Sequence, residues 1–451
     1  MLYCYMENQA FLARKRSVGE PKMNDMSSMS RESKKNQLRS RVITPGTSAG
    51  PQRRVPVPEE DSEAVVKRAH RKVQKRRLII FILILILMAA IAGGIYWYNR
   101  YYQYENASIG WERQLDREEG NFTGYKKFGD NLLKYTKDGA SYINAEGKDV
   151  WIQGYEMKSP MAIVNGGYAA IADQQGNSIY ICDLNGLQGI ATTVLPIVKV
   201  TVSAQGVVAA ILEDQAASYI YFFRKDGTEI KLSMKCVLGG EIGYPLDISL
   251  SPDGTMLTGS YAYIEDGMMH NRVAFYNFSE VGKNAPNRFV GGFHEMYKNS
   301  MVPKVQYLDN VYSAAFADDS ISFFTSKDVM SPALLLQIPV EEEIQSVFYN
   351  ESYAGIIVKS SSGEYDSRLD LYKSNGEKVF SIDFSYDYSH VDIDGDTIFL
   401  YNENSCRVYN RYGNLKYEGT FDFTVSKITR GRLPNQIIVT GPQAMKEIKL
   451  H

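Results

Sequence analysis

Cysteine and histidine are scarce in this sequence, and their scarcity excludes several kinds of site. The 451 residues contain 4 Cys and 5 His. Four cysteines are too few for a disulfide-stapled scaffold, and the common spacings of zinc ligands, Cys-x-x-Cys and His-x-x-x-His, do not occur. The sequence also has no G-x-G-x-x-G loop and no P-loop, the usual signatures of nucleotide sites. We therefore predict no catalytic, cofactor-binding or metal-binding residues.

Long apolar runs are equally scarce, since one stretch, from Leu78 to Tyr98, is both long and free of charge. About 20 apolar residues cross the roughly 30 Å hydrocarbon core of a bilayer. The basic cluster at residues 67–77 precedes this run, and Tyr and Trp residues close it. Basic clusters stay in the cytoplasm, whereas amphipathic rings suit the headgroup layer. We predict a transmembrane helix at residues 78–98, with the N-terminus cytoplasmic, the C-terminal domain extracytoplasmic and the chain in the plasma membrane.

A cleaved signal peptide is the alternative, because Ala90, Ile91 and Ala92 end the apolar run with small residues. The region before the run and the run itself are longer than a normal signal peptide allows. An uncleaved signal anchor is therefore favoured.

The parts of the chain on the two sides of this apolar segment differ in net charge. Residues 1–77 carry 18 Lys and Arg against 8 Asp and Glu, and the remainder carries 32 against 44, so the two parts have net charges of +10 and −12. Residues 1–58 are polar and lack apolar periodicity, which predicts a disordered basic cytoplasmic tail. Residues 59–77 are predicted to form a basic juxtamembrane helix. The acidic remainder argues against binding of nucleic acid.

The tail contains a G-x-S-x-G pattern at residues 46–50. A catalytic serine in this pattern needs a strand before it and a helix after it. Pro45 and Pro51 bracket the pattern instead, so we do not interpret Ser48 as a nucleophile.

The three cysteines after the apolar run cannot all pair with one another. Cys182 and Cys406 lie in runs rich in β-branched and aromatic residues, where a thiol usually serves as a small core residue. We expect both to be buried, unmodified thiols.

From about residue 105 onward, short β-rich runs end in Gly, Asp or Asn turns every 8 to 12 residues, a spacing typical of an all-β domain. A recurring unit has a strand, a turn with glycine and another strand. The turn glycines of this unit are Gly147, Gly186, Gly227, Gly376 and Gly413. Their separations of 39, 41 and 37 residues are close to the roughly 40 to 45 residues of a propeller blade.

Four strands per unit predict seven blades. Their ranges are 122–157, 159–194, 196–238, 244–294, 302–339, 343–386 and 388–421. Residues 424–450 offer three more strands, and residues 107–115 offer a fourth. Joined, these complete an eighth blade and remove the exposed sheet edges. We predict an eight-bladed β-propeller over residues 105–451, with seven blades as the alternative.

Two motifs support this fold. Residues 250–254 (Leu-Ser-Pro-Asp-Gly) match the turn of TolB-like repeats, and residues 144–151 are similar to the repeat of quinoprotein-like propellers. The chain resembles the WD40-like and quinoprotein-like β-propeller superfamily and, more narrowly, an uncharacterised membrane-anchored propeller family of Gram-positive bacteria. This resemblance implies the fold and the membrane topology only.

The densest carboxylate cluster is Asp392, Asp394 and Asp396. Such a cluster can hold Ca²⁺, but an EF-hand loop requires Gly at its sixth position, where this sequence has Thr397, and Glu at its twelfth, where it has Glu403. Strand-like residues on both sides predict the hairpin turn of the seventh blade, with Ca²⁺ binding as the alternative.

These features favour a non-enzymatic binding or scaffold module of the cell envelope. Its expected partners are an unknown envelope protein or glycan and, through residues 78–98, the lipid bilayer. An envelope enzyme acting on glycan and a transmembrane sensor are the alternatives.

The predicted partner surface is formed by two enlarged loops of the fourth blade, residues 265–271 and 294–301. In a propeller, these two connections open on the same face. Met and aromatic residues are enriched at protein interfaces, and long loops on a rigid scaffold often carry function. The candidate residues are Met268, Met269, His270, His294, Met296 and Tyr297. The alternative is that these side chains pack over the blade as a small local core.

Overall fold

The computed structural model describes residues 62–115 and 122–451. The predicted disordered tail, residues 1–58, and the pattern at residues 46–50 lie outside the described residues. The first described element is the helix α2 (Ser62–Tyr101). Its side chains from Leu78 to Tyr98 are all exposed. The part His70–Tyr101 is long and apolar enough to cross a membrane, with a mean hydropathy of 3.1 in its most apolar window, which supports a single-pass anchor.

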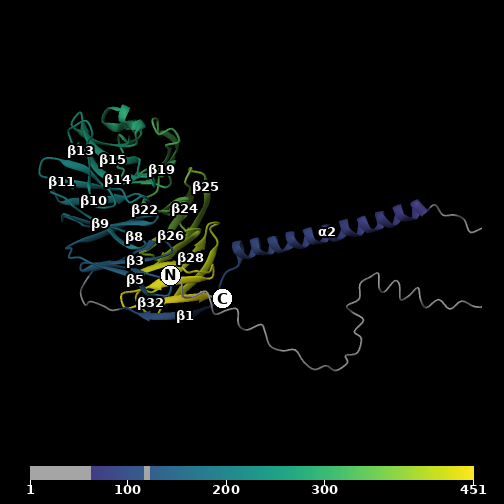
Figure 1. Cartoon of the computed structure of the whole chain (residues 1–451). Coiled ribbons are helices and arrows are strands. Elements are labelled where there is room, and N and C mark those ends of the chain that lie inside the picture. The colour runs from purple at the N-terminus through teal and green to yellow at the C-terminus, as the bar shows by residue number, and fades with distance from the viewer. Residues whose placement is uncertain (1–61, 116–121) are drawn as a thin grey trace, which may run out of the picture. The chain divides into compact units, whose positions relative to one another are not determined.

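The described residues after α2 form eight four-stranded antiparallel sheets, and seven of them run in chain order from an innermost to an outermost strand. Figure 1 shows successive sheets lying side by side. Blades one to four contain β2 (Thr123–Phe128), β3 (Asn131–Thr136), β4 (Gly139–Ile143), β5 (Asp149–Gly154); β6 (Pro160–Asn165), β7 (Tyr168–Asp173), β8 (Ser178–Asp183), β9 (Gly186–Thr192); β10 (Ile197–Val202), β11 (Val208–Glu213), β12 (Ser218–Phe223), β13 (Glu229–Cys236); β14 (Tyr244–Leu250), β15 (Met256–Glu265), β16 (Met268–Asn277) and β17 (Phe289–Phe293).

The second half of the ring repeats the same arrangement. Blades five to seven contain β18 (Lys304–Tyr307), β19 (Tyr312–Phe316), β20 (Ser320–Thr325), β21 (Ala333–Pro339); β22 (Ile344–Tyr349), β23 (Tyr353–Lys359), β24 (Ser367–Lys373), β25 (Lys378–Phe384); β26 (His390–Asp394), β27 (Thr397–Tyr401), β28 (Ser405–Asn410) and β29 (Leu415–Thr420). Three short 3-10 turns lie in or beside blade four: η1 (Val281–Asn284), η2 (Pro286–Arg288) and η3 (Glu295–Tyr297).

The eighth blade closes the ring as predicted. It combines β30 (Lys427–Arg430), β31 (Gln436–Thr440) and β32 (Ala444–Leu450) with β1 (Ala107–Gln114), which supplies the outermost strand. β1 pairs with β32 over seven residue pairs. The prediction of eight blades with an N-terminal closing strand is therefore confirmed, and the seven-bladed alternative is wrong.

The turn glycines take the backbone conformation that their role requires. All five predicted turn glycines have positive φ, from 74° at Gly147 to 127° at Gly186. At Gly227, where φ is 83°, an added Cβ would also collide with the backbone of Ile190 in the preceding blade. Glycine adopts this conformation without steric cost, which explains its recurrence at this turn.

Apolar side chains on the sheet faces pack between neighbouring blades. Each of the eight blade interfaces contains a cluster of buried apolar residues. Among the described residues, the smallest is the cluster between blades eight and one, with four buried members: Leu132, Ile143, Ile438 and Met445. We call this closing interface the seam.

The cysteines belong to these cores. Cys182, Cys236 and Cys406 are buried and form no disulfide. Burial raises the pKa of each thiol to about 12. The prediction that Cys182 and Cys406 are core thiols is confirmed.

The segment between α2 and β1 contacts blade seven. Tyr104 is buried in the apolar cluster between blades seven and eight. Its backbone N–H donates to the carbonyl of Lys416 at 2.7 Å, and the Lys416 ammonium donates to the carbonyl of Tyr98 at 3.2 Å. The start of the propeller is thus fixed by both packing and hydrogen bonds.

One predicted loop is much shorter than expected. The strands β15 and β16 remain paired up to Glu265 and Met268, so Asp266 and Gly267 alone make the turn. Residues 265–271 therefore form the tip of a long hairpin, because the backbone pairing of β15 with β16 continues beyond the point where the sequence interpretation ended the strands.

Candidate binding site at the propeller axis

A cavity of about 1170 Å³ lies at one end of the innermost strands. Every blade contributes a residue from the turn that joins its first two strands. These residues are Gly129, Gly166, Ala204, Pro252, Leu308, Asn350, Gly395 and Gly431. A cavity reached from all eight blades is centred on the axis of the ring, and we call it the channel mouth.

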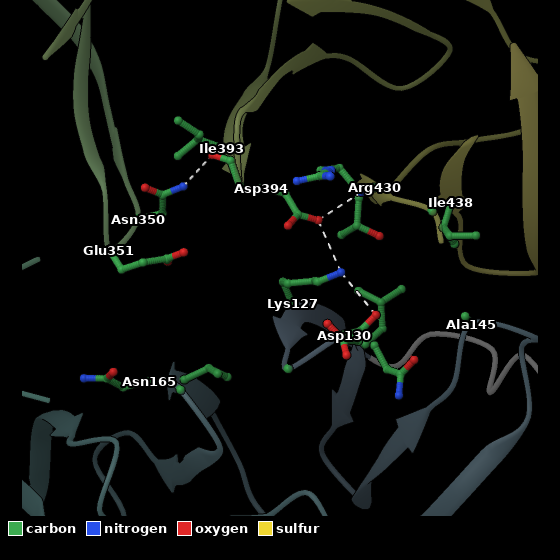
Figure 2. A pocket seen from close by; sticks show the side chains of 18 of the residues that line it. Lys127, Asp130, Ala145, Asn165, Asn350, Glu351, Ile393, Asp394, Arg430 and Ile438 are labelled. Carbon is green, nitrogen blue, oxygen red and sulfur yellow. Dashed lines mark hydrogen bonds and ion pairs between the residues drawn. The ribbon is translucent and has the colours of Figure 1, made fainter. Parts of the chain in front are cut away.

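Ion pairs and hydrogen bonds fix the charged residues of the channel mouth. Lys127 in blade one lies 3.3 Å from a carboxylate oxygen of Asp394 in blade seven, and the same oxygen accepts the backbone N–H of Arg430 in blade eight at 3.0 Å. Figure 2 shows these three residues meeting at the cavity. The Asn350 amide donates to the carbonyl of Gly395 at 2.8 Å. The contacts tie four consecutive blades together around the ring, from blade six to blade one.

A second group of charged residues stands on the innermost strands, and we call it the axial ring. Six of the eight sheets contribute to it. Its members are Lys126 (β2), Lys199 (β10), Asp247 (β14), Lys304 (β18), Asp392 (β26) and Lys427 (β30). Four lysines and two aspartates give the axial ring a formal charge of +2.

Asp247 is the most buried member, with 1% of its surface exposed. Its carboxylate lies 2.8 Å from the Lys199 ammonium and 3.1 Å from that of Lys304, and it accepts the backbone N–H of Val305 at 2.9 Å. Burial opposes the charge of Lys304, but Tyr349 and Asp247 together raise its pKa above the usual value. A buried carboxylate is stable only when neighbouring groups compensate its charge. The two ammonium groups and the Val305 N–H compensate that of Asp247, and these contacts link blades three to five.

Asp392 forms the other ion pair of the axial ring. The Lys427 ammonium lies 2.6 Å from one carboxylate oxygen, and the Tyr401 hydroxyl donates to the other at 2.6 Å. Burial, and then the charge of Asp392, raise the pKa of Tyr401. Tyr401 is therefore a neutral donor to this carboxylate at neutral pH.

Lys126 differs from the other three lysines. The residue is exposed, and its ammonium forms no hydrogen bond or ion pair among residues 62–115 and 122–451. Burial lowers the pKa of its ammonium, the charge of Lys427 lowers it further, and Asp392 opposes these effects. Lys304, in the blade on the opposite side of the ring, also lowers the pKa of Lys126.

The carboxylate cluster at the start of blade seven is a hairpin turn, as predicted. β26 ends at Asp394 and β27 begins at Thr397. The three carboxylates diverge to different bases, because Asp392 pairs with Lys427, Asp394 with Lys127 and Asp396 with Arg411.

The six residues of the predicted partner surface divide into two groups. Met268 and Met269 are each 59% exposed, and the His294 side chain is exposed. Tyr297 is fully buried and Met296 packs against the same cluster, while His270 is buried with its ring Nδ1 2.6 Å from the carbonyl oxygen of Lys298. The local-core alternative thus describes the second group.

These residues lie away from the channel mouth. The turn between β15 and β16 joins the second and third strands of its blade, and in an antiparallel meander that turn is at the other end of the strands from the first turn. A partner-binding role for the exposed group stays a prediction.

The sequence interpretation missed the channel mouth and the axial ring. Their residues come from separate blades, and six of the blades contribute only one or two charges from a short first strand. The available signal was a Lys or Asp in the first strand of six repeats, where a wholly apolar strand is expected.

The chain is similar to a known protein family and, in its fold, to several solved structures. A family model described as "Family of unknown function (DUF5711)" matches residues 100–450. No curated protein matches the sequence. Among solved structures, BamB from Moraxella catarrhalis has a TM-score of 0.46 at 12% identity, covering 76% of this chain and all of BamB. Sqt1 from Chaetomium thermophilum has a TM-score of 0.47 at 10% identity, covering 72% of this chain and 92% of Sqt1. The Gram-positive origin stays a prediction.

Proposed function

Because the chain belongs to the DUF5711 family of unknown function, we propose its function from the channel mouth: it is a single-pass membrane protein whose extracytoplasmic propeller binds a component of the cell envelope without catalysing a reaction. The observation that carries this proposal is the axial cavity of about 1170 Å³. Concave sites of this kind are where proteins bind their ligands.

The proposed membrane topology rests on charge. The basic cluster at residues 67–77 directly precedes the apolar part of α2, and positive residues stay on the cytoplasmic side. The propeller then lies outside the cytoplasm. In that position it meets envelope proteins and glycans.

The proposed role in binding rests on preorganisation. The channel mouth is built from the turns of a closed ring, and its Lys127 and Asp394 are already held by each other. A rigid site loses little conformational entropy when a ligand binds. The pairing also occupies the charged groups that acid-base catalysis would use, which supports binding over an enzymatic role.

The test is site-specific photo-crosslinking in living cells with the full-length protein. A photoreactive residue replaces Glu351, which is exposed and lines the channel mouth. The matched controls place it at Lys231, exposed on the outermost strand β13, and at Met269 on the opposite face. We expect a discrete adduct from position 351 and none from position 231. Adducts from position 269 alone would move the binding face to the hairpin of blade four and overturn this assignment.

A further inference from the structure

We infer that the turn between β28 and β29 of blade seven rests on the membrane surface, where Arg100 and Arg411 bind the phosphate group of a phospholipid. We call residues 410–416 the capping turn. The inference rests on the membrane anchor of the proposed function and goes beyond it, because it assigns a lipid-binding surface to the propeller itself. It follows from the contacts of this turn with the end of α2, from its depth and from its charges.

The capping turn satisfies carbonyl groups at the end of α2. The last four carbonyls of a helix have no partner within the helix, and the helix dipole favours a cation beside them. The Asn410 amide donates to the carbonyls of Arg100 at 2.8 Å and of Asn99 at 3.3 Å. The Lys416 ammonium donates to the carbonyls of Tyr98 at 3.2 Å and of Asn99 at 3.4 Å. Because these bonds fix the helix end against the propeller, the position of the helix in the membrane also sets that of the capping turn.

The rings of Tyr96 and Tyr412 give the depth of the capping turn. Their centroids are 6.5 Å apart in an edge-to-face arrangement. Tyr96 lies at the end of the apolar run that closes at Tyr98, where tyrosine rings occupy the boundary between lipid tails and headgroups. Arg100 follows Tyr98 by about 3 Å along the helix axis, and the headgroup layer is about 5 to 8 Å thick on each side. Arg100 and the capping turn therefore lie at the level of the lipid phosphates.

Two guanidinium groups flank the Tyr412 ring. The guanidinium carbon of Arg100 lies 4.7 Å from the ring centroid, and that of Arg411 lies 5.0 Å from it. Arg411 is also 2.9 Å from a carboxylate oxygen of Asp396. Among the residues that the structure describes, Arg100 pairs with no carboxylate, and its guanidinium donates to the Tyr96 hydroxyl at 2.5 Å. Two guanidinium groups and one carboxylate leave a positive charge in excess.

This charge and its geometry suit a phosphate group. A guanidinium presents a planar fork of N–H donors that matches the oxygens of phosphate. Phosphate is the anionic group that every phospholipid carries, and the capping turn lies at its depth. The exposed rings of Tyr98 and Tyr101 beside it suit the same headgroup layer. The surface around Tyr412 therefore extends the membrane contact of α2 onto the propeller.

The depth is tested with the full-length protein in nanodiscs of phosphatidylcholine and phosphatidylglycerol, in which some headgroups carry a nitroxide quencher. A fluorescent residue replaces Asn414 in the capping turn. The controls replace Lys231 on the outermost strand β13 and Met269 on the opposite face of blade four. We expect strong quenching at position 414 and little at positions 231 and 269. Equal quenching at all three positions, or none at position 414, overturns the inference.

Phosphate recognition is tested by titrating the full-length protein in neutral detergent micelles with phosphatidylglycerol and counting the retained lipid by native mass spectrometry. The double change Arg100→Gln and Arg411→Gln should weaken this binding by about tenfold or more, because charge-assisted hydrogen bonds to phosphate are lost. The control change Arg224→Gln and Lys231→Gln removes two exposed charges elsewhere and should leave the affinity unchanged. Equal affinities of the two double variants overturn the inference.

Two further measurements separate lipid binding from a structural role. The ion pair of Arg411 with Asp396 is largely exposed and contributes little to stability, so the Gln variant should melt within a few degrees of the wild type. The variant with Arg100→Lys and Arg411→Lys keeps both charges and should bind phosphatidylglycerol more tightly than the Gln variant. If the Lys and Gln variants bind equally weakly, charge is not what holds the lipid and the inference fails.

Failure of the lipid surface can be distinguished from failure of the proposed function. Nanodiscs and micelles have no cytoplasmic side, so these results do not depend on the orientation of the chain in the cell. Crosslinking at position 351 reports on the channel mouth and is independent of the capping turn. The proposed function therefore stands if position 351 gives its adduct while the Arg100 and Arg411 variant still binds the lipid normally.

Discussion

Individual residues on the opposite face of blade four show how little exposure can be inferred from residue type. Met268 and Tyr297 were predicted to share one surface, yet Met268 is 59% exposed and Tyr297 is 0% exposed. The Tyr297 ring belongs to the cluster between blades four and five, with Phe275 and Phe324. The burial of an aromatic residue in a loop depends on neighbours from another blade, which the local sequence does not specify.

Substitutions at these positions should therefore have opposite effects on stability. Tyr297→Ser removes a buried ring and should lower the free energy of unfolding by about 3 kcal/mol or more. The double change Met268→Ser and Met269→Ser alters exposed side chains and should stay within about 0.5 kcal/mol of the wild type. Calorimetric unfolding of the full-length variants measures both.

The same double variant tests the predicted partner surface. If the exposed methionines bind a partner, the double variant loses crosslinks from the neighbouring position His294 while its melting temperature stays unchanged. Retained crosslinks, or their absence in the wild type as well, would remove these residues from consideration.

The charges of the axial ring mark the limit of prediction from single residues. Lys126 is followed by Lys127, and nothing local distinguishes the unpaired ammonium from the one paired with Asp394. The difference arises because blades seven and eight place Asp394 and Lys427 beside blade one, after more than 250 intervening residues.

Among the elements, the strands and blades were largely predictable. The turns at Gly147, Gly186 and Gly227 need positive φ, so their spacing in the sequence gives the blade period directly. The tip of the hairpin between β15 and β16 was predicted as a loop, because its polar residues resemble a loop although they remain paired. Strand pairing beyond the core depends on backbone hydrogen bonds that carry little sequence signal.

The closing strand β1 should contribute strongly to stability. A propeller piece beginning at residue 106 keeps the seven residue pairs between β1 and β32, whereas one beginning at residue 122 exposes the edge of β32. We expect the shorter piece to melt at a markedly lower temperature, as measured by circular dichroism. A third piece beginning at residue 102 retains Tyr104 and should melt highest. Equal melting temperatures for the first two pieces would contradict the role of β1 in closure.

For the whole molecule, the proposed orientation predicts the pattern of protease digestion. In cells whose wall has been removed but whose membrane is intact, added protease should remove an epitope tag at the C-terminus and leave a tag at the N-terminus. The reason is that the basic cluster keeps the N-terminal side in the cytoplasm. Permeabilised cells, in which both tags should be lost, provide the control. Loss of the N-terminal tag alone from intact cells would reverse the orientation.

The attachment of the tether to β1 has a mechanical consequence. Five residues separate the end of α2 at Tyr101 from the start of β1 at Ala107, so a pull on the membrane anchor is transmitted to the strand that closes the ring. The load falls first on the contacts of Tyr104 with blade seven, and then on the β1–β32 hydrogen bonds beside the seam. Separation at the seam would part Lys127 of blade one from Asp394 of blade seven. Tension along the tether would thus dismantle the channel mouth while the remaining blade interfaces still hold, and a ligand bound there would be released before the domain unfolds.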